Sequence, residues 1–305
     1  MMELQPNPAG NTDTALPDEL AHKKKSSLWK DVFFRLIKSK TSLIGLCIIL
    51  LLIVTAIFAP LIATHNPTSY ESITNRYQPP SAEHFLGTDA LGRDIFSRIV
   101  YGTRISIQIG VFTVAISMII GVLLGGIAGY FGKWIDQIIM RVVDILMAFP
   151  SILLAIALVA VLGPSLQNAM IAVGIVGIPQ FARIVRSAVL SVKETEYIEA
   201  AKAIGAKNGR VLMQHVLPNC LAPIIVQATL SVGTAILDAA GLSFLGLGAQ
   251  PPTPEWGAML SDGRAALQNA PWVVAFPGIA IFLVVLGFNL FGDGLRDALD
   301  PRLKE

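Results

Sequence analysis

The chain has 305 residues, of which 53% are hydrophobic and 14% are charged, and its mean hydropathy is +0.64. Because an ordinary soluble domain has about 25% charged residues, this composition excludes a typical soluble enzyme. The apolar content is too high for a disordered chain, two cysteines are too few for a disulfide scaffold, and a net charge of +2 is small for a nucleic-acid-binding protein. The composition therefore indicates an integral membrane protein.

The N-terminal segment divides into a polar tail and a helix. Residues 1–27 are polar and predict a disordered cytoplasmic tail. In residues 28–41 the apolar side chains recur at helical spacing, from Trp29 and Val32 to Ile37, while Lys30 and Arg35 take the other face. This pattern predicts an amphipathic helix lying in the inner headgroup region, with a plain positively charged flank as the alternative.

Five charge-poor runs are long enough to cross a bilayer, which needs about 20 apolar residues in a helix. They are residues 43–63, 105–131, 145–182, 211–247 and 265–292. The run 145–182 is too long for one crossing, and Gly163-Pro164-Ser165 supplies turn residues that divide it into two. The sequence thus predicts an all-α polytopic protein with six transmembrane helices, a membrane domain over residues 42–293 and a cytoplasmic tail over residues 294–305.

The placement of Lys and Arg predicts the orientation, because cytoplasmic loops retain these residues. Seven precede the first span, and a cytoplasmic N-terminus places 18 of the 23 on the inner side. With six spans, both termini are then cytoplasmic.

The first outer loop, residues 64–104, ends in the stretch 84–98. Thr88 or Asp89 is a candidate cap for a short helix there, and Asp94 and Arg98 are four residues apart. We expect this helix either to contact an external partner or cover the pore, or to pack in the interface.

The motifs of several kinds of chemistry are absent from the sequence. It contains no phosphate-binding loop of the Gly-x-x-x-x-Gly-Lys-Ser/Thr type, no nucleophile elbow and no His-Glu-x-x-His segment. The histidines, His22, His65, His84 and His215, show no ligand spacing, so we expect ordinary surface residues and no metal site. No catalytic residue is predicted, and energy for any transport must come from another protein.

Two acids and one glycine series mark the spans. Asp144 is close to the end of its span with Arg141 as a candidate partner, whereas Asp238 lies deeper. Asp238 is a candidate for lining a hydrophilic pathway, or for a hydrogen bond to a neighbouring helix.

Glycines at intervals of four leave one face of the second span bare and predict close helix packing, within this chain or with another subunit: Gly121, Gly125 and Gly129.

The cytoplasmic loop 191–216 contains a short amphipathic pattern. Tyr197, Ala200, Ala201 and Ile204 share one helical face, and Gly205 can end the helix in the left-handed conformation. Such a helix fits a groove on a soluble partner, although periodicity alone favours a helical connector on the membrane surface.

This loop resembles the Glu-Ala-Ala loop of the integral-membrane subunits of bacterial ABC importers. The matching residues are Glu199-Ala200-Ala201, then Gly205, then Val216-Leu217-Pro218, with His215 where an apolar residue is usual. Residues 85–105, 140–146, 242–257 and 289–301 are similar to the peptide and nickel branch of that family, and most of all to the second permease subunits of dipeptide importers. Only the first 40 residues fall outside the resemblance.

The resemblance implies the type I ABC importer permease fold in the bacterial cytoplasmic (inner) membrane, and a subunit that is not an enzyme. It implies three kinds of partner besides membrane lipid: a homologous second permease, two ATP-binding subunits that bind ATP and Mg, and an extracytoplasmic solute-binding protein. No cofactor on this chain and no nucleic acid are implied. The coupling residues would be Tyr197, Glu199, Ala200, Ala201, Ile204, Gly205, Lys207 and Arg210. The expected cargo is a dipeptide or short peptide, with nickel, haem or another small solute, or an ion-coupled carrier acting alone, as alternatives.

Overall fold

The computed structural model describes residues 28–69 and 75–299, and within them it is helical with no strand. The predicted tail 1–27 lies outside the described residues. The helices are α1 (Leu28–Lys38), α2 (Lys40–Ile57), α3 (Ala59–Ile62), α4 (Ile95–Phe131), α5 (Lys133–Met147), α6 (Ser151–Leu162), α7 (Leu166–Lys193), α8 (Glu196–Ala203), α9 (Asn208–Val211), α10 (Leu221–Phe244), α11 (Trp256–Gly263) and α12 (Trp272–Leu299).

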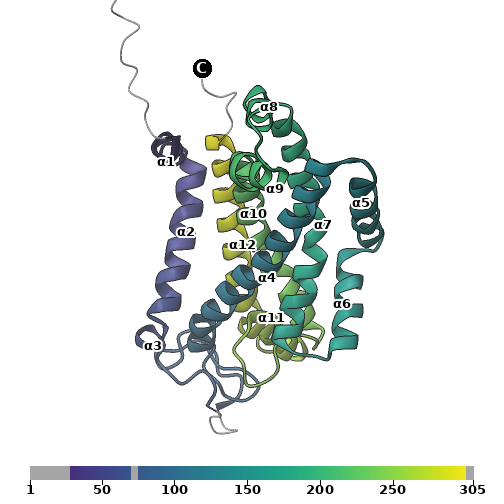
Figure 1. Ribbon diagram of the computed structural model, residues 1–305. Coiled ribbons are helices and arrows are strands. Elements are labelled where there is room, and N and C mark those ends of the chain that lie inside the picture. The colour runs from purple at the N-terminus through teal and green to yellow at the C-terminus, as the bar shows by residue number, and fades with distance from the viewer. Residues whose placement is uncertain (1–27, 70–74, 300–305) are drawn as a thin grey trace, which may run out of the picture.

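Five segments among the described residues are long and apolar enough to span a membrane: α2, α4, α7, residues 208–244 and α12. The bent pair α5 and α6 makes a sixth if it counts as one span. Figure 1 shows α8, α1 and the end of α12 at one end of the molecule, with α3 and α11 at the other. This arrangement is compatible with the predicted cytoplasmic loop and termini, whose orientation relative to the membrane stays a prediction.

The third span does not follow the predicted course. Ile145 was expected to open it, but Ile145 lies within α5, and the chain bends by 91° before α6 begins at Ser151. Pro150 explains the break, because a proline disfavours helical geometry at the residue before it and has no N–H to donate. At 1.5 Å per residue, the 12 residues of α6 measure about 18 Å.

The short separate helix expected in the stretch 84–98 is also absent. Asp94, rather than Thr88 or Asp89, is the N-cap, and its carboxylate accepts the N–H of Ser97 at 2.7 Å. From Ile95 the helix α4 runs without interruption for 37 residues. The arginines in its first turns have backbone partners, because Arg98 donates to the carbonyl of Pro67 and Arg104 to that of Ala56.

The bare glycine face of α4 packs against α7 of the same chain. A Cβ atom on Gly121 would overlap Phe181, one on Gly125 would overlap the backbone of Ala182, and Gly129 lies against Val189. Small residues allow this close approach of two helix backbones. The contact fixes α7 on α4, and α7 leads directly into the loop 191–216.

Candidate functional site

The helix α8 is ended by its glycine. Gly205 has a φ of +87°, and its N–H donates to the carbonyl of Lys202 at 2.9 Å while the N–H of Ala206 donates to that of Ala201 at 3.2 Å. This pair of bonds is the Schellman motif, which satisfies the last carbonyls of a helix. A Cβ on Gly205 would meet no heavy atom within 4 Å, so a larger residue there would strain only the backbone.

One side chain anchors α8 and the others face outward. Ile198 is fully buried in a cluster with Val185 and Val189 of α7 and with Val211 and Val216. Tyr197 is 46% exposed and Ile204 is 87% exposed, so both apolar side chains point away from the protein. The other predicted coupling residues are exposed too, apart from the half-buried Ala201: Glu199, Ala200, Gly205, Lys207 and Arg210. The sequence pattern did not single out Ile198.

The end of α4 holds both halves of this loop. The hydroxyl of Tyr130 donates to Asn208 Oδ1 at 3.2 Å, and the ammonium of Lys202 lies 5.6 Å from the centre of the Tyr130 ring. Lys193 at the end of α7 donates to the carbonyl of Gly129 at 3.1 Å. The loop is therefore connected to α4 as well as to α7, with which it is continuous.

Two ion pairs join α5 to α7, just before the loop. Arg186 binds Asp136 through two hydrogen bonds of 2.5 and 2.6 Å, and Arg183 binds Asp144 at 2.7 Å. The expected partner of Asp144, Arg141, was wrong: the carboxylate binds Arg183 of the neighbouring helix α7 instead. Bidentate arginine–carboxylate pairs fix orientation as well as distance, so α5 is expected to follow α7 when α7 moves.

Asp238 lies on a cavity between four helices. The cavity has a volume of about 350 Å³, and Asp238 of α10 is half-buried at its wall. Its polar lining comes from α4, α6, α7 and α10: Thr113, Ser117, Ser151, Gln180, Ser231, Thr234 and Asp238. A cavity with polar and apolar walls inside a bundle of membrane helices is compatible with the predicted hydrophilic pathway.

At the other end of the molecule, ion pairs and hydrogen bonds organise the outer loop. Arg93 binds Asp89 at 2.7 Å and Asp262 at 3.2 Å, and Arg98 lies 3.6 Å from Asp89 rather than forming the expected pair with Asp94. Glu255 caps α11 by accepting two backbone N–H groups. Burial raises the pKa of the Glu255 carboxyl, and these two hydrogen bonds oppose the rise.

The histidines depart from expectation. His84, predicted as a surface residue, is buried, and it approaches His65 at the side chain of Asp94. Spacing gave no sign of this, because the two histidines are 19 residues apart on one loop. His215 is half-buried in the turn after α9, and His22 lies outside the described residues.

Comparisons with known proteins decide the family. Residues 121–305 match the model of the binding-protein-dependent transport system inner membrane component, and residues 27–80 match the N-terminal TM domain of oligopeptide transport permease C. The chain belongs to this family of ABC importer permeases. It is thus a transport subunit of the bacterial inner membrane, with ATP hydrolysis performed by separate subunits, and the alternative of an ion-coupled carrier acting alone is excluded.

Individual relatives agree with this membership. The chain is 62% identical over 278 residues to the dipeptide transport system permease protein DppC of Alkalihalophilus pseudofirmus, covering 91% of both chains. It is 49% identical over 276 residues to the glutathione transport system permease protein GsiD of Pectobacterium atrosepticum, covering 90% of this chain and 92% of the relative. The fold is similar to a chain of the MetNI methionine ABC transporter in an inward-facing conformation, with a TM-score of 0.55 and 21% identity over 67% of this chain and 97% of the other. The family works with a partner permease, ATPases and a binding protein.

Proposed function

We propose that this permease forms, with a homologous second permease, the pathway by which a dipeptide or short peptide enters the cell, and that α8 is its docking element for an ATP-binding subunit. Two ATP-binding subunits would supply ATP and Mg, and an extracytoplasmic binding protein would deliver the cargo. The relatives support peptide cargo, since their names specify dipeptide and glutathione. Nickel, haem or another small solute is the alternative cargo, because the binding protein largely determines which solute is transported.

The observation that supports the docking role is the combination of one buried anchor with an exposed apolar surface. Ile198 is buried against the spans, whereas the large apolar side chains of Tyr197 and Ile204 are exposed. A short helix with small residues and exposed apolar side chains fits a groove on a partner. Since α8 follows α7 within three residues, a push on α8 is transmitted to the spans.

The test of this role is a change at Gly205. Gly205→Ala is expected to lower peptide-stimulated ATP hydrolysis and uptake about tenfold, because a residue with a Cβ costs about 1–2 kcal/mol in the left-handed conformation. The measurement is both activities in proteoliposomes containing the full complex. Gly209→Ala is the matched control, since Gly209 also has open space around it but lies in the helix α9.

Two further variants sharpen the same test. Glu199→Gln removes a charge from the exposed side of α8 and is expected to weaken assembly with the ATP-binding subunit. Uptake that survived deletion of residues 197–210 would show that α8 is not the docking element.

For the cavity, we propose that Asp238 faces the moving cargo and pairs with its amino group. Asp238→Asn is expected to lower peptide uptake about tenfold at unchanged ATP hydrolysis, because a hydrogen bond to a charged group contributes about 1.5–3 kcal/mol. Uptake per ATP hydrolysed in proteoliposomes measures this, with Asp238→Glu as the charge-preserving control. Equal uptake by Asp238→Asn and the unmodified protein would assign the carboxylate to helix packing.

A further inference from the structure

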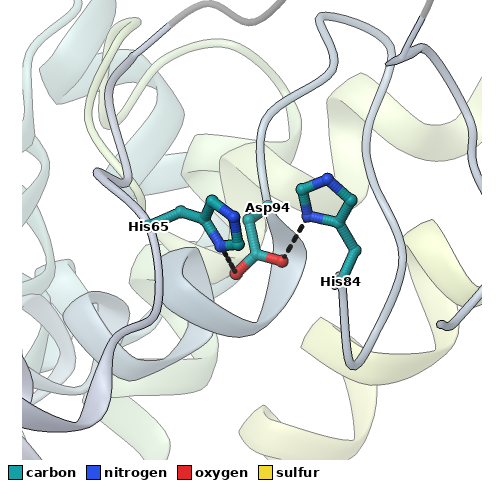
Figure 2. Close-up of side chains that lie close together, drawn as sticks. All are labelled: His65, His84 and Asp94. Atoms are coloured by element: carbon teal, nitrogen blue, oxygen red, sulfur yellow. Dashed lines mark hydrogen bonds and ion pairs between the residues drawn. The ribbon is translucent and has the colours of Figure 1, made fainter. Parts of the chain in front are cut away.

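Two imidazoles and a carboxylate meet at the outer end of α4 (Figure 2). His65 follows α3, His84 lies in the outer loop, and Asp94 caps α4, so three separate segments contribute one side chain each. His84 Nδ1 lies 3.0 Å from one carboxylate oxygen of Asp94, and His65 Nδ1 lies 3.9 Å from the other. The centroids of the two imidazole rings are 4.7 Å apart, and the ring planes are tilted by 34° to each other.

The environment of this trio is that of a built site with one accessible side. The side chains of His84 and Asp94 are 1% and 0% exposed, whereas that of His65 is 27% exposed. Asp94 is held in place by the Ser97 N–H, and the hydroxyl of Thr64 contacts both Asp94 and His65. Two candidate ligands are thus fixed in the interior, and the third stands where an ion from the outside can reach it.

The spacing of the candidate ligand atoms suits a small cation. One nitrogen from each histidine and one oxygen from Asp94 lie within 4.8 Å of one another. Ligands around a tetrahedral zinc ion are about 2.0–2.2 Å from the metal, hence about 3.4 Å from each other. The exposed ring of His65 has to move by only on the order of 1 Å to complete that geometry.

We propose that His65, His84 and Asp94 form an open binding site for a divalent first-row transition-metal ion such as Zn²⁺. Two imidazoles with one carboxylate match the nitrogen and oxygen preference of such ions, and three protein ligands leave a position for water. The ion is bound by the lone pair of the His84 ring nitrogen that faces Asp94, so the proton of this neutral imidazole is on the other ring nitrogen in the bound state. Once bound, the metal ion links the end of α3 and the outer loop to the first turn of α4. The site is independent of the proposed function.

The experiment uses the full-length chain in detergent, purified with a tag that contains no histidine and stripped with a chelator. Co²⁺ is the spectroscopic probe and Zn²⁺ the competitor, with thermal unfolding as a second readout. We expect one equivalent of Co²⁺ to bind and be displaced by Zn²⁺, and Zn²⁺ to raise the melting temperature. His65→Ala is expected to lower the affinity at least about tenfold and to abolish the Zn²⁺-dependent shift.

Two variants separate binding from folding. Asp94→Asn keeps a residue that caps helices well but removes the anionic ligand, so it is expected to weaken binding while α4 stays folded. His215→Ala removes a half-buried histidine of the turn after α9, at the other end of the molecule from α3, and is expected to change neither readout. The proposal is overturned if the folded chain binds no stoichiometric metal, if His65→Ala and Asp94→Asn bind as the unmodified chain does, or if His215→Ala weakens binding equally. In those cases the trio is a hydrogen-bonded unit of the outer loop.

Discussion

Replacing Ile198 by alanine is expected to release α8 from the spans and to lower ATP-dependent uptake about tenfold or more. Ile198 is fully buried among valines of α7 and of the turn after α9, and truncating a buried isoleucine to alanine costs about 2–5 kcal/mol. Because α8 has only eight residues, it is not stable as a helix without this contact. Uptake in proteoliposomes and hydrogen exchange of the α8 amides measure the two consequences together.

The matched control for this prediction is Ile204→Ala. Ile204 is 87% exposed, so its truncation is expected to leave hydrogen exchange in α8 unchanged while weakening the association with the ATP-binding subunit. The two isoleucines thereby distinguish folding of the loop from docking. Unchanged exchange and uptake in Ile198→Ala would contradict the role of this side chain as the anchor.

Reversing one charge between α5 and α7 is expected to uncouple transport from ATP hydrolysis. Asp136→Arg places a second cation beside Arg186 in place of a bidentate partner, and we expect peptide uptake to fall about tenfold while the complex still hydrolyses ATP. The exchange Asp136→Arg with Arg186→Asp is expected to restore most of the uptake, because the pair is re-formed in the opposite sense. Uptake and ATP hydrolysis, measured on the same vesicles, check both variants.

The neighbouring pair Arg183–Asp144 provides the comparison. Its side chains are 48% and 53% exposed, against 34% and 18% for Arg186 and Asp136, and exposed ion pairs contribute about 1 kcal/mol or less. Asp144→Arg is therefore expected to have a smaller effect. If Asp136→Arg transports normally, or if the double exchange transports no better than either single variant, the pair does not transmit the movement of α7.

Much of the fold could be predicted from the sequence where the signal is local. Runs without charge predict the membrane helices, because a charge inside the hydrocarbon is expensive whatever the tertiary structure. Gly205 similarly predicts the end of α8, since the left-handed conformation depends on the local backbone and is adopted most readily by glycine. The bend at Pro150 was missed because the start of the third span was predicted from the absence of charged residues alone. By that criterion a proline counts the same as a leucine.

What the sequence does not show are contacts between distant segments. The helical face of Tyr197 and Ile204 was identified, but only the packing of α7 on α8 reveals that Ile198 is the buried side chain. Asp144 pairs with Arg183 rather than Arg141 because of how α5 and α7 are placed. His84 lies beside Asp94 and His65 because of how the outer loop is folded. Spacing along the chain contains no information on such pairs.

The short length of α6 has a consequence for the surrounding lipid. At about 18 Å it is well below the roughly 30 Å thickness of the hydrocarbon layer, and α5 turns away at 91° instead of completing the crossing. Acyl chains beside α6 must shorten, or a neighbouring polypeptide must replace them, and each ångström of hydrophobic mismatch costs a fraction of a kcal/mol. Membrane thickness is thereby a physical variable that acts on this flank of the transporter.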